Sequence, residues 1–275
     1  MRAAVVQLSA TQDKETNLEL AVRTVEQAAS AGAELVVLPE ATMCGFGSPS
    51  TDLAASAEPL DGPFVTTLAT VASATGATVV AGMFEPASDS QRVYNTVVAV
   101  SPDGLLGHYR KLHLYDALGW QESRRVAPGH PETDGVLVVP VGEFRLGVMT
   151  CYDLRFPEVT RTLCDAGATA LAVPAAWVAG PRKAEQWATL LAARAIESTS
   201  YVLAAAQPAP DYTGCSTIID PSGEALVVLD DLSDARCHDL SQALGFADLS
   251  EAEVARVREV LPVLDHRRFS VLPRP

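Results

Sequence analysis

The stretch Val148-Met149-Thr150-Cys151-Tyr152-Asp153-Leu154-Arg155-Phe156-Pro157-Glu158 places a cysteine where a strand gives way to a helix. An apolar run that starts at Phe144 ends just before Cys151, and a helix-like pattern resumes at Glu158. The sulfur should therefore lie at the carboxyl end of a strand, where open α/β sheets form ligand crevices and a nearby helix N-terminus favours a thiolate. A lone cysteine is more often buried packing material, so the role of Cys151 depends on the rest of the chain.

Strands and helices alternate on both sides of this stretch. On the N-terminal side, the expected strands are Ala3–Leu8, Leu35–Leu38 and Thr78–Gly82, with a helix from the N-cap Asn17 to just before Gly32 and another over Pro63–Ala74. On the C-terminal side, we expect the helix Glu158–Ala166, the strand Ala170–Val173, the helix Ala184–Ser198 and the strand Tyr201–Ala206. Such alternation is typical of parallel or mixed sheets covered by helices.

Three turn sequences interrupt the alternation and predict hairpins. They are Ser101-Pro102-Asp103-Gly104 between 94–100 and 105–110, Gly142-Glu143 between 136–141 and 144–149, and Pro221-Ser222-Gly223 between 215–220 and 224–229. A last helix should open with the capping box Ser250-Glu251-Ala252-Glu253. The pattern predicts an α/β fold in one domain spanning 1–275, with two sheets packed together and helices outside. The polar segment 230–242 is expected to be a flexible insertion.

Composition narrows the class of protein. The chain has 275 residues, of which 48% are apolar and 20% charged, so it can bury a full core. Its net charge of −14 argues against nucleic acid or an anionic membrane as partner. No apolar run reaches the length of a membrane span, and the first residues lack a signal-peptide layout. Five scattered cysteines, without metal-type pairing, predict a reduced, cytoplasmic location and no metal site.

Two further segments supply candidate partners for the cysteine. Glu40 directly follows an apolar strand in Leu38-Pro39-Glu40, and Lys111 ends a hairpin strand in Tyr109-Arg110-Lys111-Leu112-His113-Leu114. Taken alone, each has a simpler interpretation: a solvated carboxylate for Glu40 and a surface cation for Lys111. His113 could act as a base for a thiol, but no accompanying motif supports a direct catalytic role.

Together these segments resemble the nitrilase, or carbon–nitrogen hydrolase, superfamily over nearly the whole chain. The motifs that carry the resemblance are Leu38-Pro39-Glu40, Tyr109-Arg110-Lys111-Leu112-His113-Leu114, Cys151-Tyr152-Asp153-Leu154-Arg155-Phe156-Pro157-Glu158 and Arg194-Ala195-Ile196-Glu197. The resemblance implies a four-layer α-β-β-α sandwich that forms homodimers, or higher homo-oligomers, through its outer helices. The tail 269–275 would then reach the dimer interface.

The resemblance also implies roles for the site residues. Cys151 would be the nucleophile and Glu40 its base, since a thiol with a pKa near 8.5 needs activation at neutral pH. Lys111 would meet the oxyanion of the tetrahedral intermediate, helped by the backbone N–H of Tyr152. Glu122 matches the family's second glutamate and would raise the pKa of Glu40 as a like-charged neighbour. No metal or organic cofactor is required.

The substrate is less defined than the chemistry. Arg155 is a candidate ligand for a substrate carboxylate, with an ion pair to Asp153 or Glu158 as the alternative. Trp177, Tyr115 and Tyr152 are candidate pocket residues, although aromatic core packing is equally open for Tyr115. The Cys151 and Lys111 motifs most resemble the branch of ω-amidases and deaminated-glutathione amidases. That branch usually carries Gly-Pro-x-His-Trp, whereas this chain reads Gly180-Pro181-Arg182-Lys183-Ala184-Glu185-Gln186-Trp187, three residues longer and with Gln186 in place of histidine.

The sequence therefore predicts a cofactor-independent thiol amidase that cleaves a small-molecule amide through a Cys151 thioester. Two alternatives stay open at this point. One is nitrile hydrolysis by the same nucleophile. The other is a binding protein that has kept the fold without catalysis.

Overall fold

The computed structural model describes residues 1–89, 91–229 and 243–272 of the chain. The helices are α1 (Lys14–Ser30), α2 (Pro63–Thr75), α3 (Pro157–Asp165), α4 (Lys183–Ser198) and α5 (Glu251–Val260), and short 3₁₀ turns cover Ala54–Ser56, Glu122–Arg124 and Cys151–Arg155. The strands are β1 (Arg2–Val6), β2 (Leu35–Val37), β3 (Thr78–Pro86), β4 (Val93–Ser101), β5 (Gly104–Arg110), β6 (Val126–Ala127), β7 (Leu137–Val141), β8 (Phe144–Val148), β9 (Ala170–Ala175), β10 (Tyr201–Ala206), β11 (Thr217–Ile219), β12 (Ala225–Val228) and β13 (Leu244–Asp248).

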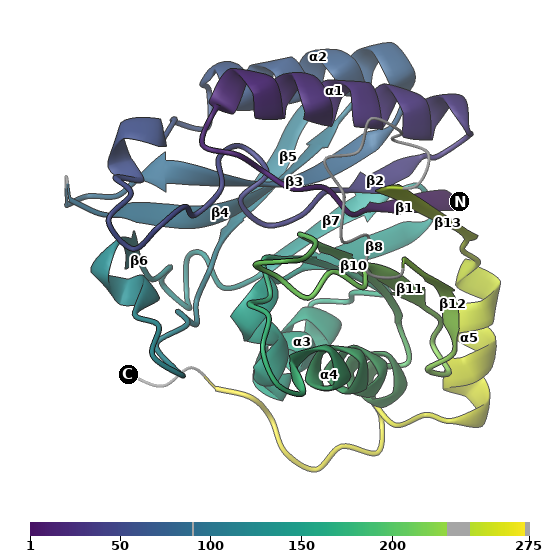
Figure 1. Ribbon diagram of the computed structural model, residues 1–275. Coiled ribbons are helices and arrows are strands. Elements are labelled where there is room, and N and C mark those ends of the chain that lie inside the picture. Colours follow the sequence, from purple (N-terminus) through teal and green to yellow (C-terminus); the bar gives the residue numbers. More distant parts are fainter. Residues whose placement is uncertain (90, 230–242, 273–275) are drawn as a thin grey trace.

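These strands form two mixed sheets of similar design (Figure 1). The first sheet has the order β13-β1-β2-β3-β4-β5, with β6 beside β4, and the second has the order β12-β11-β10-β9-β8-β7. In each sheet three central strands are parallel, β1, β2 and β3 in the first and β8, β9 and β10 in the second. The three predicted hairpins are present as β4–β5, β7–β8 and β11–β12.

Three apolar clusters hold four layers together. The first lies between α1, α2 and the first sheet, the second lies between the two sheets, and the third lies between the second sheet and α3 and α4. Alternate residues of β1 divide between clusters, because Ala4 and Val6 face the helices while Ala3 and Val5 face the other sheet. Burial on both faces explains why the strands read as continuous apolar runs. The predicted α-β-β-α sandwich is confirmed.

Two predicted helix starts need correction, and two strands were missed. Helix α1 is capped by Asp13, which accepts hydrogen bonds from Glu15 N and Thr16 N. Asn17, the predicted cap, is instead buried one turn into the helix, where its amide donates to the carbonyl of Met43 at 3.1 Å. Ser250 does precede α5, but its side chain makes no capping hydrogen bond. Strands β6 and β13 were not predicted, and they add to the first sheet by pairing with β4 and β1, respectively.

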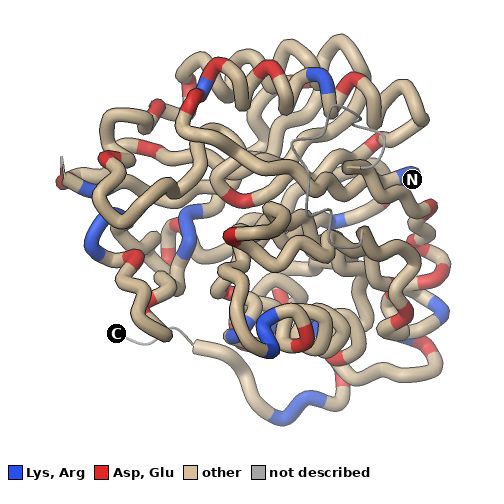
Figure 2. The backbone as a smooth tube through the Cα atoms, in the orientation of Figure 1, with Lys and Arg blue, Asp and Glu red and all other residues tan. Residues whose placement is uncertain are grey.

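Acidic residues occur along the outer helices of the molecule. Figure 2 shows Asp and Glu positions along α1 at the top and along α5 at the right of this view. In the described ranges, no helix combines the length and apolarity needed to cross a membrane. The predicted insertion at 230–242 lies outside the described residues.

Candidate active site

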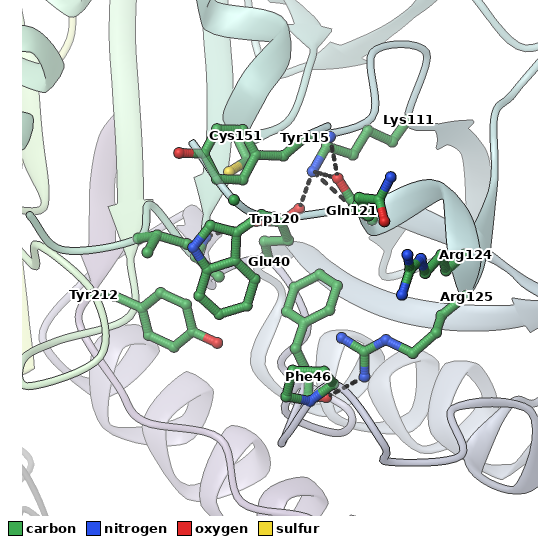
Figure 3. Close-up of a pocket in the computed structure, with 15 residues that line it drawn as sticks. Glu40, Phe46, Lys111, Tyr115, Trp120, Gln121, Arg124, Arg125, Cys151 and Tyr212 are labelled. Atoms are coloured by element: carbon green, nitrogen blue, oxygen red, sulfur yellow. Dashed lines mark hydrogen bonds and ion pairs between the residues drawn. The ribbon is translucent and has the colours of Figure 1, made fainter. Parts of the chain in front are cut away.

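Both sheets contribute to one cluster of functional side chains. Glu40 follows β2 and Lys111 follows β5, both in the first sheet, whereas Cys151 follows β8 and Ala176 follows β9 in the second. Figure 3 shows Cys151, Lys111 and Glu40 directed toward one another at a common cavity. The structure thus brings together the three residues predicted as the catalytic set.

Glu40 is fully buried, so the solvated-carboxylate interpretation is wrong. Its Oε1 accepts hydrogen bonds from Asn95 Nδ2 at 2.7 Å and Lys111 Nζ at 2.9 Å, and its Oε2 accepts one from Ala176 N at 2.6 Å. Gly82 of β3 permits this arrangement, because a Cβ there would lie 2.7 Å from the Glu40 Cα. The chain after β2 therefore holds one carboxylate with a fixed orientation in the interior.

Lys111 is only 2% exposed, so it is not the surface cation that its neighbour Arg110 suggested. Its Nζ donates to Glu40 Oε1 and also to Glu122, at 3.0 Å to Oε1 and 2.9 Å to Oε2. Burial acts to lower the Lys111 pKa, but the charges of Glu122 and Glu40 outweigh it and raise that pKa well above its usual value. Lys111 is therefore an ammonium group shared by two carboxylates.

Cys151 occupies a strained backbone conformation at the start of its 3₁₀ turn. Its φ of 50° lies in the left-handed region, which non-glycine residues rarely adopt and which recurs at functional sites. A capping box of Thr150 and Asp153 stabilises the turn. Arg194 of α4 holds its far end by donating two hydrogen bonds to the Leu154 carbonyl, at 2.6 and 3.0 Å. These contacts fix the direction of the Cys151 side chain.

The carboxylate of Asp153 lies behind this turn and is completely buried. It accepts hydrogen bonds from Tyr109 OH at 2.7 Å and from the backbone N–H of Thr150 at 3.2 Å. His113 donates its backbone N–H to the same carboxylate and places its ring Nδ1 2.7 Å from Oδ1, while the ring stacks on Phe156 at 3.7 Å. His113 therefore supports the turn from behind and does not line the cavity.

The surroundings of Cys151 keep its sulfur protonated. Burial is the main cause that raises the Cys151 pKa well above its ordinary value, and the negative charge of Glu40 adds to it. The positive charge of Lys111 acts in the opposite direction without cancelling these effects. A protonated thiol beside a buried carboxylate is a nucleophile that still requires a base.

The cavity in front of the cluster has a volume of about 180 Å³. Figure 3 shows Phe46, Trp120 and Tyr212 around it, together with Arg124 and Arg125 on the side away from Cys151. Phe46 and Tyr212 come from the two Pro/Gly-rich segments 44–50 and 207–214, which follow strands. The cavity can therefore hold a small molecule with apolar parts against the aromatic rings.

The predicted substrate-binding residues lie close together, though not all at the cavity. Tyr115, Tyr152 and Trp177 line a smaller hollow next to Cys151, and the Tyr115 and Tyr152 ring centroids are 5.0 Å apart. Arg155 lies over the Trp177 ring at 4.8 Å from its centroid and donates to Gln186 Oε1 at 2.7 Å. Within the described part of the chain, Arg155 forms no ion pair, so the predicted pairing with Asp153 or Glu158 is wrong.

One contributor to the site was not predicted. Asn95 of β4 donates its amide to both Glu40 and Glu122, at 2.7 and 3.2 Å. An amide inside a strand that is buried and mostly apolar was the available signal. Lys183, the first residue of α4, lines the smaller hollow beside Cys151.

Comparison with known proteins agrees with this geometry. A family model for carbon–nitrogen hydrolases matches residues 2–258. The chain belongs to the carbon–nitrogen hydrolase family. A hydrolase of Mycobacterium tuberculosis is 43% identical over 244 residues, which cover 82% of this chain and 84% of the relative. A deaminated glutathione amidase of Escherichia coli O157:H7 is 36% identical over 98% of each chain.

Solved structures of this family show the same fold. A CN-hydrolase superfamily protein from Xanthomonas campestris superposes with a TM-score of 0.84 at 28% identity, over 99% of both chains. With amidases among the sequence relatives as well, this carbon–nitrogen hydrolase is an enzyme of amidase type.

Proposed function

We propose that the protein hydrolyses the C–N bond of a small amide through a thioester on Cys151. The observation that carries the proposal is the buried cluster of Cys151, Glu40 and Lys111 at the wall of a cavity. Relatives named deaminated glutathione amidase support amide hydrolysis as the reaction.

In the first half of the reaction, Glu40 accepts the Cys151 proton while the sulfur attacks the amide carbon. The carbonyl oxygen becomes an oxyanion, which Lys111 Nζ and the backbone N–H of Tyr152 stabilise. Such a donor typically contributes about 3–4 kcal/mol to lowering the barrier. The C–N bond then breaks, and protonated Glu40 gives its proton to the leaving ammonia or amine.

In the second half, Glu40 removes a proton from water as the water oxygen attacks the thioester. Collapse of the second tetrahedral intermediate releases the carboxylic acid and returns the proton to the Cys151 sulfur. The hydrogen bonds from Asn95 and Ala176 keep the Glu40 carboxylate in position for both transfers. Glu122 holds Lys111 and also accepts the Tyr115 N–H at 2.6 Å, which ties the loop after β5 to the site.

The test is ammonia release from a panel of small ω-amides, N-carbamoyl amino acids and aliphatic amides. For every amide that the protein hydrolyses, we expect Cys151→Ala to reduce kcat by about 10⁴-fold or more. Cys164→Ala is the matched control, because this cysteine is also buried and free but does not line the cavity. Activity that survives Cys151→Ala, or equal losses in both variants, would exclude Cys151 as the nucleophile.

A second measurement tests the intermediate itself. Protein quenched with acid during turnover should carry the acyl group on the peptide that contains Cys151, detected by mass spectrometry. If turnover proceeds and no acyl adduct accumulates in the wild type or in Glu40→Gln, the thioester route is wrong.

A further inference from the structure

Lys183 has an unusual position for a basic residue. It is the first residue of α4, a helix of 16 residues, and is preceded by Arg182 in the left-handed conformation with a φ of 59°. The N-terminus of a helix carries partial positive charge, so a lysine there is disfavoured and an anion is favoured. Trp177 fixes this end of the helix by donating its indole N–H to the Lys183 carbonyl at 3.1 Å.

The Lys183 side chain points back toward the catalytic cysteine. The residue is 5% exposed, and its Nζ donates to Tyr115 OH at 3.3 Å. The same atom lies 4.7 Å from the Trp177 ring centroid and 4.8 Å from that of Tyr115. Lys183 and Cys151 line the same small hollow. The ammonium group is therefore held by aromatic rings at the edge of the site.

No carboxylate neutralises this cation within the described residues. Neither Lys183 nor Arg155 has an Asp or Glu oxygen within 4.0 Å, although the chain as a whole has a net charge of −14. Both cations lie within 5 Å of the Trp177 ring centroid. Buried charges in proteins are normally paired, so a buried lysine that shares the Trp177 ring with a half-buried arginine, and has no carboxylate partner, indicates that an anion binds here.

We propose that Lys183, together with Arg155, binds a carboxylate group of the substrate and selects amides that carry one. The inference rests on the proposed amidase function. Lys183 contributes a charge-assisted hydrogen bond at the hollow, and Arg155 adds positive charge from its position over the Trp177 ring. Gln186, which replaces the histidine of the related branch, orients Arg155 through their 2.7 Å hydrogen bond.

The kinetic test compares two amides of equal length, glutaramate with its free carboxylate and the neutral 5-hydroxypentanamide. We expect Lys183→Met to lower kcat/KM for glutaramate by about 10- to 100-fold and to change that for the neutral amide by less than about 3-fold. Lys183→Arg should restore part of the loss. Arg182→Met is the matched control, since this neighbouring side chain is 79% exposed and pairs with Glu185. If Lys183→Met lowers kcat/KM equally for both amides, or for neither, the proposal is overturned.

A binding measurement separates this proposal from the amidase function. Calorimetric titration of the Cys151→Ser protein with succinate, glutarate and adipate requires no turnover. At least one of the three should bind, and Lys183→Met in the same background should weaken it by about 10-fold or more. If none binds at millimolar concentration, or if both proteins bind equally, the carboxylate site is wrong. If binding follows the prediction while no amide is hydrolysed, the proposed reaction fails and the site stands.

Discussion

Two lysines lie in the cavity walls beside Cys151, and their charges are balanced in opposite ways. Lys111 is 2% exposed and is neutralised by Glu40 and Glu122. Lys183 is 5% exposed and has no carboxylate partner among the residues that the structure describes. The pKa of Lys111 is raised well above its usual value because the two carboxylates outweigh its burial, whereas burial and then the charge of Arg155 lower the pKa of Lys183.

The presence or absence of carboxylate partners distinguishes two roles that a buried lysine can have in a binding site. Lys111 belongs to a charge network that is complete before substrate arrives, which suits a group that must meet an oxyanion without reorganisation. Lys183 is part of a network that lacks an anion. A lysine of the first kind supports both stability and catalysis, while one of the second kind supports specificity.

The largest expected contrast is in stability. Lys111→Met leaves Glu40 and Glu122 buried without their shared cation, so we expect the free energy of unfolding to fall by about 3–5 kcal/mol. Lys183→Met leaves no carboxylate unpaired, so its effect should stay within about 1 kcal/mol and could be stabilising. Urea denaturation followed by circular dichroism measures both. Similar losses in the two variants would remove the distinction between the two lysines.

A smaller effect is expected from raising the pH. Cys151 and Lys111 both have raised pKa values in the folded protein, so the stability they contribute is present below their unfolded values of 9.0 and 10.5. That contribution is lost as the pH rises through the folded pKa values, with a slope of about 1.4 kcal/mol per pH unit for each proton involved. Urea denaturation between pH 8 and 10.5 should show this decline.

Cys151→Ala provides the control for this slope. The variant lacks the thiol, so its free energy of unfolding should fall less steeply than that of the wild type from about pH 9 upward. The contribution of Lys111 is unchanged in the variant. Parallel curves for the wild type and Cys151→Ala would mean that the thiol is not held protonated in the folded protein.

The smallest effect concerns the two cations of the proposed carboxylate site. Arg155→Met removes a repulsive charge and should raise the Lys183 pKa. Because the ammonium form binds the carboxylate, kcat/KM for glutaramate should fall at alkaline pH as Lys183 loses its proton. In Arg155→Met the decline of kcat/KM should begin at higher pH than in the wild type. The value of kcat/KM below that pH should nevertheless be lower than in the wild type, because one cation is missing. A decline at unchanged pH would show that Arg155 does not act on Lys183.

The sequence predicted that Glu40 and Cys151 lie at one edge of the strands, because each residue follows the end of an apolar run. Glu40 comes after Pro39, which ends its strand, and Cys151 comes where the apolar run of β8 stops. The periodic patterns and turn residues also predicted both sheets and all three hairpins. Local sequence is informative in these places because it sets where a strand must end.

The sequence was less informative wherever a distant segment decided the outcome. Asp13 and Asn17 are both suitable N-caps, and only the tertiary contact of Asn17 with Met43 decides between them. Arg182 and Lys183 are adjacent in the sequence, and only the packing of Trp177 and Tyr115 decides that Lys183 is enclosed while Arg182 stays exposed. Strand β13 is short, and its partner β1 lies at the other end of the chain. These features depend on packing between segments that no local pattern describes.

The division of the site between two sheets has a consequence for how the chain becomes active. Glu40 and Lys111 belong to the first half of the sequence, but the Ala176 N–H that orients Glu40 and the Gln207 amide that binds its carbonyl are 136 and 167 residues further along. During synthesis, the strands β1 to β6 of the first sheet therefore keep their inner apolar face uncovered until the second sheet has emerged, and β13 is added last. Activity recovered during refolding should then report the docking of the two sheets, later than the formation of either sheet alone.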